Sequence, residues 1–140
     1  MSIPIEILKI KDDDRYGYHV LCRVHIKNKE FRMLVDTGSS TTIFNINKIK
    51  DISQNDIQDN NNKMYTVGSN NMKSKYLNID EMRIGDIIIK DYKSMILDLS
   101  HINEYYKENG IPLIDGILGG DILFEYKAII DYENRQMMLS

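Results

Sequence analysis

The chain has 140 residues, of which 42% are hydrophobic, and a formal net charge of -3. This length and composition suit one domain with its own core, so we expect a single domain over residues 1–140 and not two lobes. Basic residues are mixed with acidic ones, which leaves no basic face for phosphates and argues against nucleic acid binding. The single cysteine, Cys22, excludes an internal disulfide and a thiol-based metal cluster.

The first residues lack the basic and apolar regions of a secretory signal, and no apolar run approaches the ~20 residues that a membrane helix needs. We therefore expect no membrane partner. The chain as it stands predicts a cytoplasmic protein, and an upstream signal in a longer gene product would make it periplasmic or secreted.

The first predicted elements are strands. Residues 3–11 are rich in β-branched residues and residues 16–26 alternate, with a polar turn of three aspartates between them that lacks the ligand spacing of a calcium loop. Cys22 lies on the apolar face of the second strand, where we expect a buried thiol and not a nucleophile. His19 and His25 fall on the opposite face and are expected to be exposed, and we predict no metal site there.

The remaining elements follow from turn and cap signals. Strands are predicted at residues 31–35 and 41–44, a short helix or irregular loop at 47–63, and a hairpin around a Gly-Ser-Asn-Asn turn at 64–73. Further strands are expected at 76–79, 82–84, 87–89 and 94–99. Ser100 is expected to cap a helix over 101–109, and a short helix at 121–125 precedes a closing hairpin of 128–132 and 136–139. The pattern predicts an all-β fold with one or two short helices.

One loop carries the residues expected to do chemistry. Asp36, Thr37, Gly38 and Ser39 lie between an apolar strand that enters the loop and another that leaves it. Gly38 permits a backbone conformation closed to residues with a Cβ and lets a substrate approach closely. The Thr37 and Ser39 hydroxyls can hold the Asp36 carboxylate by hydrogen bonds. The alternative is a turn without chemistry, because Asp, Gly and Ser also form turns for local reasons.

A second segment, Asp-Gly-Ile-Leu-Gly-Gly-Asp-Ile-Leu at residues 115–123, follows in the chain. With the Asp-Thr-Gly loop, in this order, it resembles the apolar strand and short helix beside the catalytic loop of retropepsin-like aspartic peptidases, the retroviral-type single-domain enzymes. By itself the segment could be a Gly-rich turn between buried strands.

The resemblance covers most of residues 16–140 as a pattern and implies a single-lobed, closed, β-barrel-like acid protease fold. It assigns Asp36 as the catalytic aspartate, with Thr37 and Gly38 in the catalytic loop. Ile117 and Leu118 then lie on the strand behind the loop, and we count them with Ser39 among the substrate-binding candidates.

The family also has a flap hairpin after the catalytic loop, and the hairpin predicted at residues 64–73 takes that place. A flap holds an extended peptide and shields it from water while it is cleaved. The candidates for substrate contact are Tyr65, Thr66, Val67 and Gly68. The alternative is an ordinary exposed hairpin.

An aspartic peptidase needs two carboxylates that share one proton, and this chain has one Asp-Thr-Gly motif. The resemblance therefore implies a homodimeric endopeptidase that cleaves extended polypeptide with a water activated between two Asp36 carboxylates, without metal or organic cofactor. We expect residues 3–10 and 136–140 to form the interface, unless the N-terminal strand folds back on its own domain.

Two other interpretations stay open. One is a non-catalytic peptide-binding or dimerisation module of the same fold. The other is an unrelated small β-barrel whose turn imitates the motif.

Overall fold

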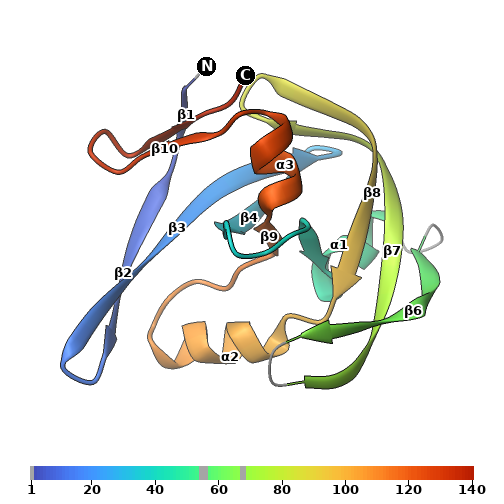
Figure 1. Cartoon of the computed structure of the whole chain (residues 1–140), viewed down its shortest axis with the longest axis horizontal. Helices are drawn as coiled ribbons and strands as arrows, with labels where there is room; N and C mark the ends of the chain where they lie inside the picture. The colour runs from blue at the N-terminus through green and yellow to red at the C-terminus, as the bar shows by residue number, and fades with distance from the viewer. Residues whose placement is uncertain (1, 54–56, 67–68) are drawn as a thin grey trace.

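The computed structural model (Figure 1) describes the backbone of residues 2–53, 57–66 and 69–140, and the side chains of these residues except 53, 59–66 and 69–74. The described elements are mainly strands, with three short helices, which confirms the predicted all-β class. In chain order they are β1 (Ser2–Pro4), β2 (Glu6–Asp12), β3 (Arg15–Ile26), β4 (Lys29–Val35), β5 (Ile43–Asn45), α1 (Ile46–Ser53), β6 (Ile57–Thr66), β7 (Ser69–Ile84), β8 (Ile87–Leu97), α2 (Ser100–Glu108), β9 (Gly116–Leu118), α3 (Gly120–Glu125), β10 (Ile129–Asp131) and β11 (Gln136–Met138).

The larger sheet has eight strands in the order β2-β3-β4-β9-β5-β8-β7-β6. Most neighbours are antiparallel, but β4 pairs with β9 in parallel, as does β5 with β8. One further pairing, His25 with Arg83, joins β3 to β7, so the sheet curls until strands from its two halves meet. The short strands β4, β9 and β5 lie in the middle of the sheet, and the Asp-Thr-Gly loop connects β4 to β5.

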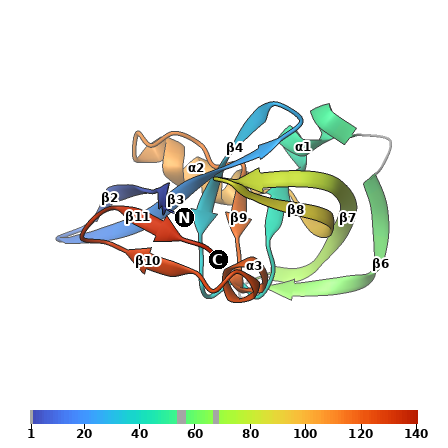
Figure 2. The ribbon, with the colours of Figure 1, turned by 90° about the horizontal axis from the view of Figure 1, so that it is seen from above.

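The smaller sheet joins the two ends of the chain. Its order is β1-β11-β10, with Ser2 opposite Met138, and the termini accordingly lie close together (Figure 2). The predicted strand over residues 3–11 is therefore two strands. The break is at Ile5, whose N–H donates to the Arg135 carbonyl where the chain passes from the small sheet to the large one. Within this structure the N-terminal strand folds back on its own chain.

Two apolar cores occupy the two faces of the large sheet. Phe31 and Met33 of β4 point into the first core, where Phe31 packs edge to face on Phe44 at 5.5 Å between ring centroids. Leu34, on the other face of β4, packs against the second core, which contains the fully buried Tyr106 of α2. Helix α2 thus covers the second face of the sheet.

Three predicted elements differ from the structure. Residues 57–63, expected as helix or loop, belong to β6, because pairing with β7 at Ile57–Leu77 and Gln58–Tyr76 overrides the weak strand propensity of this polar segment. The runs at 76–79 and 82–84 are parts of β7, and those at 87–89 and 94–99 largely form β8. Ser100 is not the cap of α2 but its first residue, and its N–H donates to Asp98 at 2.9 Å.

Candidate active site

The Asp-Thr-Gly loop begins where β4 ends. The Asp36 N–H donates to the Leu118 carbonyl at 3.0 Å, which continues the parallel pairing of β4 with β9 by one residue. The Gly38 N–H donates to Asp36 Oδ1 at 2.9 Å, and the Ser39 N–H donates to the Asp36 carbonyl at 3.1 Å. The loop backbone therefore orients the carboxylate of the half-buried Asp36, a task that we had expected the Thr37 and Ser39 hydroxyls to perform.

Two glycines that follow β9 support the loop from behind. The Gly120 N–H donates to the Ser39 carbonyl at 2.7 Å. A Cβ at Gly119 would lie 2.4 Å from the Thr41 carbonyl oxygen and 2.9 Å from that of Ser39, closer than such atoms can approach. The loop thus rests directly on the backbone of residue 119, and the Ser39 hydroxyl closes it with a 2.8 Å hydrogen bond to the Thr41 carbonyl.

A polar network that the sequence did not reveal fixes the far end of the loop. The fully buried Thr42 accepts a hydrogen bond from the Gly119 N–H at 3.0 Å and donates one to Asp121 Oδ1 at 2.8 Å. Asp121 Oδ2 accepts from the Tyr92 hydroxyl of β8. Burial, together with the hydrogen bond to Asp121, raises the pKa of Tyr92, so this phenol stays protonated and donates. Asp121 belongs to the segment at residues 115–123 that the sequence singled out, whereas no sequence pattern indicated that Tyr92 lies at this site.

A cavity of about 230 Å³ opens beside Asp36. Its walls come from β3, the end of β4 and the residue after β10, namely Tyr18, His19, Val20, Leu34, Val35, Asp36 and Tyr132. The prediction that His19 is exposed was wrong. This ring is half-buried, and its Nδ1 lies 2.7 Å from the Tyr106 hydroxyl because α2 packs on that face of the sheet.

The other predicted site residues lie at different depths. Thr37 and Gly38 are exposed and Ser39 is half-buried, so these three form the surface of the loop. The side chains of Ile117 and Leu118 are only 7% and 0% exposed, so this chain presents Leu118 to the site through its backbone.

The structure describes the predicted flap residues only in part. Tyr65 and Thr66 belong to β6, with Thr66 opposite Ser69 of β7, but their side chains lie outside the described set. Val67 and Gly68 lie outside the described residues.

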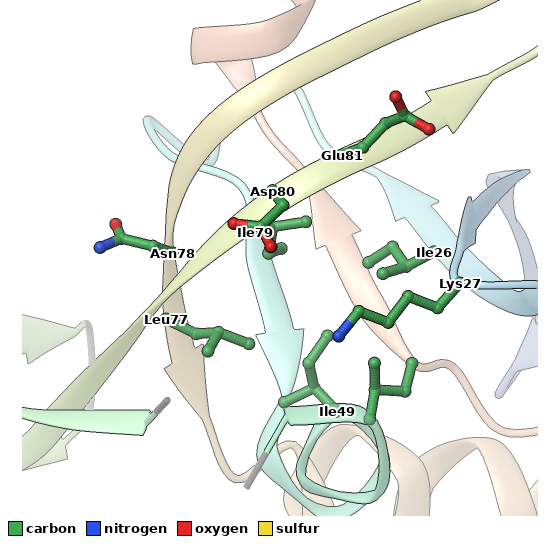
Figure 3. Close-up of a pocket in the computed structure, with 9 residues that line it drawn as sticks. Ile26, Lys27, Ile49, Leu77, Asn78, Ile79, Asp80 and Glu81 are labelled. Atoms are coloured by element: carbon green, nitrogen blue, oxygen red, sulfur yellow. The ribbon is translucent and has the colours of Figure 1, made fainter. Parts of the chain in front are cut away.

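A second cavity, of about 140 Å³, lies between the β3–β4 turn, α1 and β7 (Figure 3). Its lining includes Ile26, Ile49 and Leu77 and none of the predicted site residues. Among the side chains that the structure describes, no group of three or more His, Cys, Asp or Glu is placed to hold a metal ion. In the described part of the chain, no helix combines the length and the apolar character needed to cross a membrane.

The chain was compared with known proteins. The family model described as aspartyl protease matches residues 22–122. No curated protein matches the sequence.

Three similar solved structures share the fold. A retropepsin-like aspartic protease from Rickettsia conorii has a TM-score of 0.60 at 17% identity, over 99% of this chain and 92% of its own. The retroviral protease-like domain of Ddi1 from Leishmania major has a TM-score of 0.58 at 14% identity, over 86% of each chain. The EIAV protease, in complex with the inhibitor HBY-793, has a TM-score of 0.59 at 18% identity, over 86% of this chain and 97% of its own. The match over residues 22–122 shows that the chain belongs to the aspartyl protease family, and the solved structures show that it has the retropepsin-like fold.

Proposed function

We propose that the chain is an aspartic endopeptidase that works as a homodimer and cleaves extended polypeptide. The observation that carries this proposal is the Asp36 carboxylate, which the loop backbone orients at the edge of an open cavity in a chain with a single Asp-Thr-Gly motif. One carboxylate alone cannot act as acid and base together, so the second must come from Asp36 of another copy.

In this dimer the two carboxylates hold one proton between them, because two like charges in contact cannot both ionise. The ionised carboxylate takes a proton from a water, and the water oxygen attacks the peptide carbonyl carbon. The protonated carboxyl donates its proton to the carbonyl oxygen as the tetrahedral intermediate forms. A proton then passes to the amide nitrogen, the carbon–nitrogen bond breaks, and the products are a new carboxyl end and a new amino end.

Exposed apolar side chains support the proposed pairing of two copies. Phe124 of α3 is 87% exposed, Ile129 of β10 is 57% exposed, and Tyr132, which lines the Asp36 cavity, is 58% exposed. Helix α3 and β10 lie on the side of the molecule that also carries the chain ends (Figure 2). Strand β10 is an edge of the small sheet, and an edge strand is a template for pairing with another chain. Contact between two such surfaces would cover this apolar area and bring the two loops together.

The test combines mass in solution with cleavage of a denatured protein at several pH values. We expect a dimer, a bell-shaped pH profile with an acidic or weakly acidic optimum, and loss of cleavage in Asp36→Asn. Asp91→Asn is the matched control, because Asp91 is an exposed residue of β8 with a φ of 53°, which asparagine tolerates. Equal cleavage activity of the wild type and Asp36→Asn would refute the proposed function.

Mixing the two proteins tests the shared site directly. If one site needs Asp36 from both copies, an excess of Asp36→Asn traps wild-type chains in inactive heterodimers, and activity falls beyond the effect of adding Asp91→Asn. Wild-type activity that is indifferent to the excess would contradict the shared site. A dimer that binds peptides without cleaving them would instead identify the non-catalytic module.

A further inference from the structure

His19 is the one histidine on the cavity beside Asp36, among the side chains that the structure describes. The phenol rings of Tyr18 and Tyr132 stand at the same cavity and are 55% and 58% exposed. A water occupies about 30 Å³ of liquid, so a cavity of about 230 Å³ has room for several waters, or for one side chain of a bound peptide.

Tyr106 of α2 holds the His19 ring from behind. The Tyr106 hydroxyl lies 2.7 Å from His19 Nδ1, and the ring centroids are 5.5 Å apart at an angle of 42°. Tyr106 is fully buried, and burial raises its pKa to about 12, so its hydroxyl keeps its proton. The contact links α2, which covers one face of the sheet, to the wall of the cavity.

This contact determines which nitrogen of His19 carries the proton. Within the described residues, we find no second hydrogen-bond partner for the Tyr106 hydroxyl. If His19 Nδ1 donated to Tyr106, the phenol proton would be buried without an acceptor, which is costly. Tyr106 therefore donates to Nδ1, and Nε2 bears the remaining hydrogen.

The charge of the cavity favours an uncharged ligand. Burial lowers the pKa of His19, although the negative charge of Asp36 acts in the opposite direction, so the ring is neutral at neutral pH. A carboxylate in the ligand would be repelled by Asp36. A side-chain amide carries a carbonyl acceptor for the Nε2–H and no net charge.

We propose that His19 is a specificity-determining residue, which donates a hydrogen bond from Nε2 to the side-chain amide of a Gln or Asn in a bound polypeptide. Tyr106 acts through His19 as its positioning residue. This inference rests on the proposed function for its ligand, an extended peptide, and adds the side chain that the cavity selects.

The experiment uses matched peptides in which each position around the cleaved bond is in turn Gln or its near-isostere Met. For the wild type we expect a Gln preference in kcat/KM at one position, expressed mainly in KM. His19→Phe removes the donor and should reduce that preference about 3- to 10-fold, the range of one neutral hydrogen bond. Tyr106→Phe keeps the ring but frees Nδ1, so a smaller reduction is expected.

Two further variants separate recognition from folding. The double variant His19→Phe with Tyr106→Phe leaves no buried hydroxyl unpaired, and it should show the same lost preference as His19→Phe. His25→Phe is the matched control, because His25 lies on the same strand, contacts Glu30 at 3.5 Å and does not line the cavity. It should keep the wild-type preference.

The outcomes distinguish this inference from the proposed function. Cleavage with the same Gln-to-Met ratio in the wild type and in all His19 and Tyr106 variants would overturn the role of His19 and leave the endopeptidase standing. If the wild type cleaves nothing, binding of the same peptides decides: a Gln preference that His19→Phe abolishes would support the inference without catalysis, and its absence would overturn it.

Discussion

Replacing Gly119 by alanine tests whether the loop that carries Asp36 rests on the backbone of β9 and the turn that follows. An added Cβ would lie 2.4 Å from the Thr41 carbonyl oxygen, and ordinary contact begins at 3.4 Å, so the loop must move by the difference, about 1 Å. The obstructing atoms belong to the backbone of the loop and not to a side chain that could rotate away. The loop that carries Asp36 must therefore shift, or β9 must shift beneath it.

The expected losses of stability and of cleavage activity follow from that displacement. Overpacking of this kind costs about 1–3 kcal/mol. Unfolding entropy of about 2.1 cal/mol/K per residue gives about 0.29 kcal/mol/K for a chain of this size, so a loss of about 2 kcal/mol lowers Tm by about 7 °C. In the proposed endopeptidase, a misplacement of Asp36 by about 1 Å should lower kcat about 100-fold.

The assay is thermal unfolding together with peptide cleavage, with two graded controls. A Cβ at Gly120 would lie 3.4 Å from the Ser39 carbonyl oxygen, and one at Gly17 would lie 3.9 Å from that of Ile10, so both alanines are close to ordinary contact. We expect the decreases in Tm and in cleavage rate to be large for Gly119→Ala, small for Gly120→Ala and negligible for Gly17→Ala. If Gly119→Ala has the same Tm and the same cleavage rate as the wild type, the close contact between the backbone of residue 119 and the loop is refuted.

Three further predictions concern buried groups. Thr42→Val removes the acceptor of the Gly119 N–H and the donor to Asp121, so urea unfolding should show a free energy of unfolding about 1–3 kcal/mol lower than in the wild type. Thr42→Ser keeps the hydroxyl and should retain most of this free energy, and equal losses in both variants would contradict the network. Burial raises the pKa of the Cys22 thiol to about 12, so an alkylating reagent at pH 8 should label it only after unfolding, and rapid labelling of the folded protein would disprove its burial. Burial lowers the pKa of His19, so the unfolded chain binds this proton more readily than the folded chain. Stability that is present above about pH 6.5 should therefore be lost as the pH falls below that value. The urea midpoint of His19→Phe should depend less on pH between 7 and 5 than that of the wild type, and parallel curves for the two proteins would exclude this contribution.

The sequence predicted the parts of the protein whose signals are local. The loop at Asp36 lies between two apolar strands, and the short helix at 121–125 follows two glycines, so turn chemistry and periodicity locate both. The strands predicted at 82–84 and 87–89 likewise leave two residues between them, where β7 turns into β8. These features need only a few neighbouring residues to define them.

The parts that were missed depend on contacts between residues far apart in the chain. Tyr92 is 29 residues from Asp121, and Tyr106 is 87 residues from His19, so no spacing rule could pair them. The alternation of β3 placed His19 correctly on the face opposite Cys22, but the packing of α2 on that face could not be seen in the alternation. Residues 57–63 became a strand only because β7 lies beside them.

The pairing of β1 with β11 has a consequence for regulation. Because one chain completes this sheet by itself, the sheet needs no strand from a partner, and we expect a single subunit to fold before any site is assembled. In the proposed enzyme, cleavage would then be governed by mass action: dilution would switch it off without denaturing it, and local crowding of the subunits would switch it on.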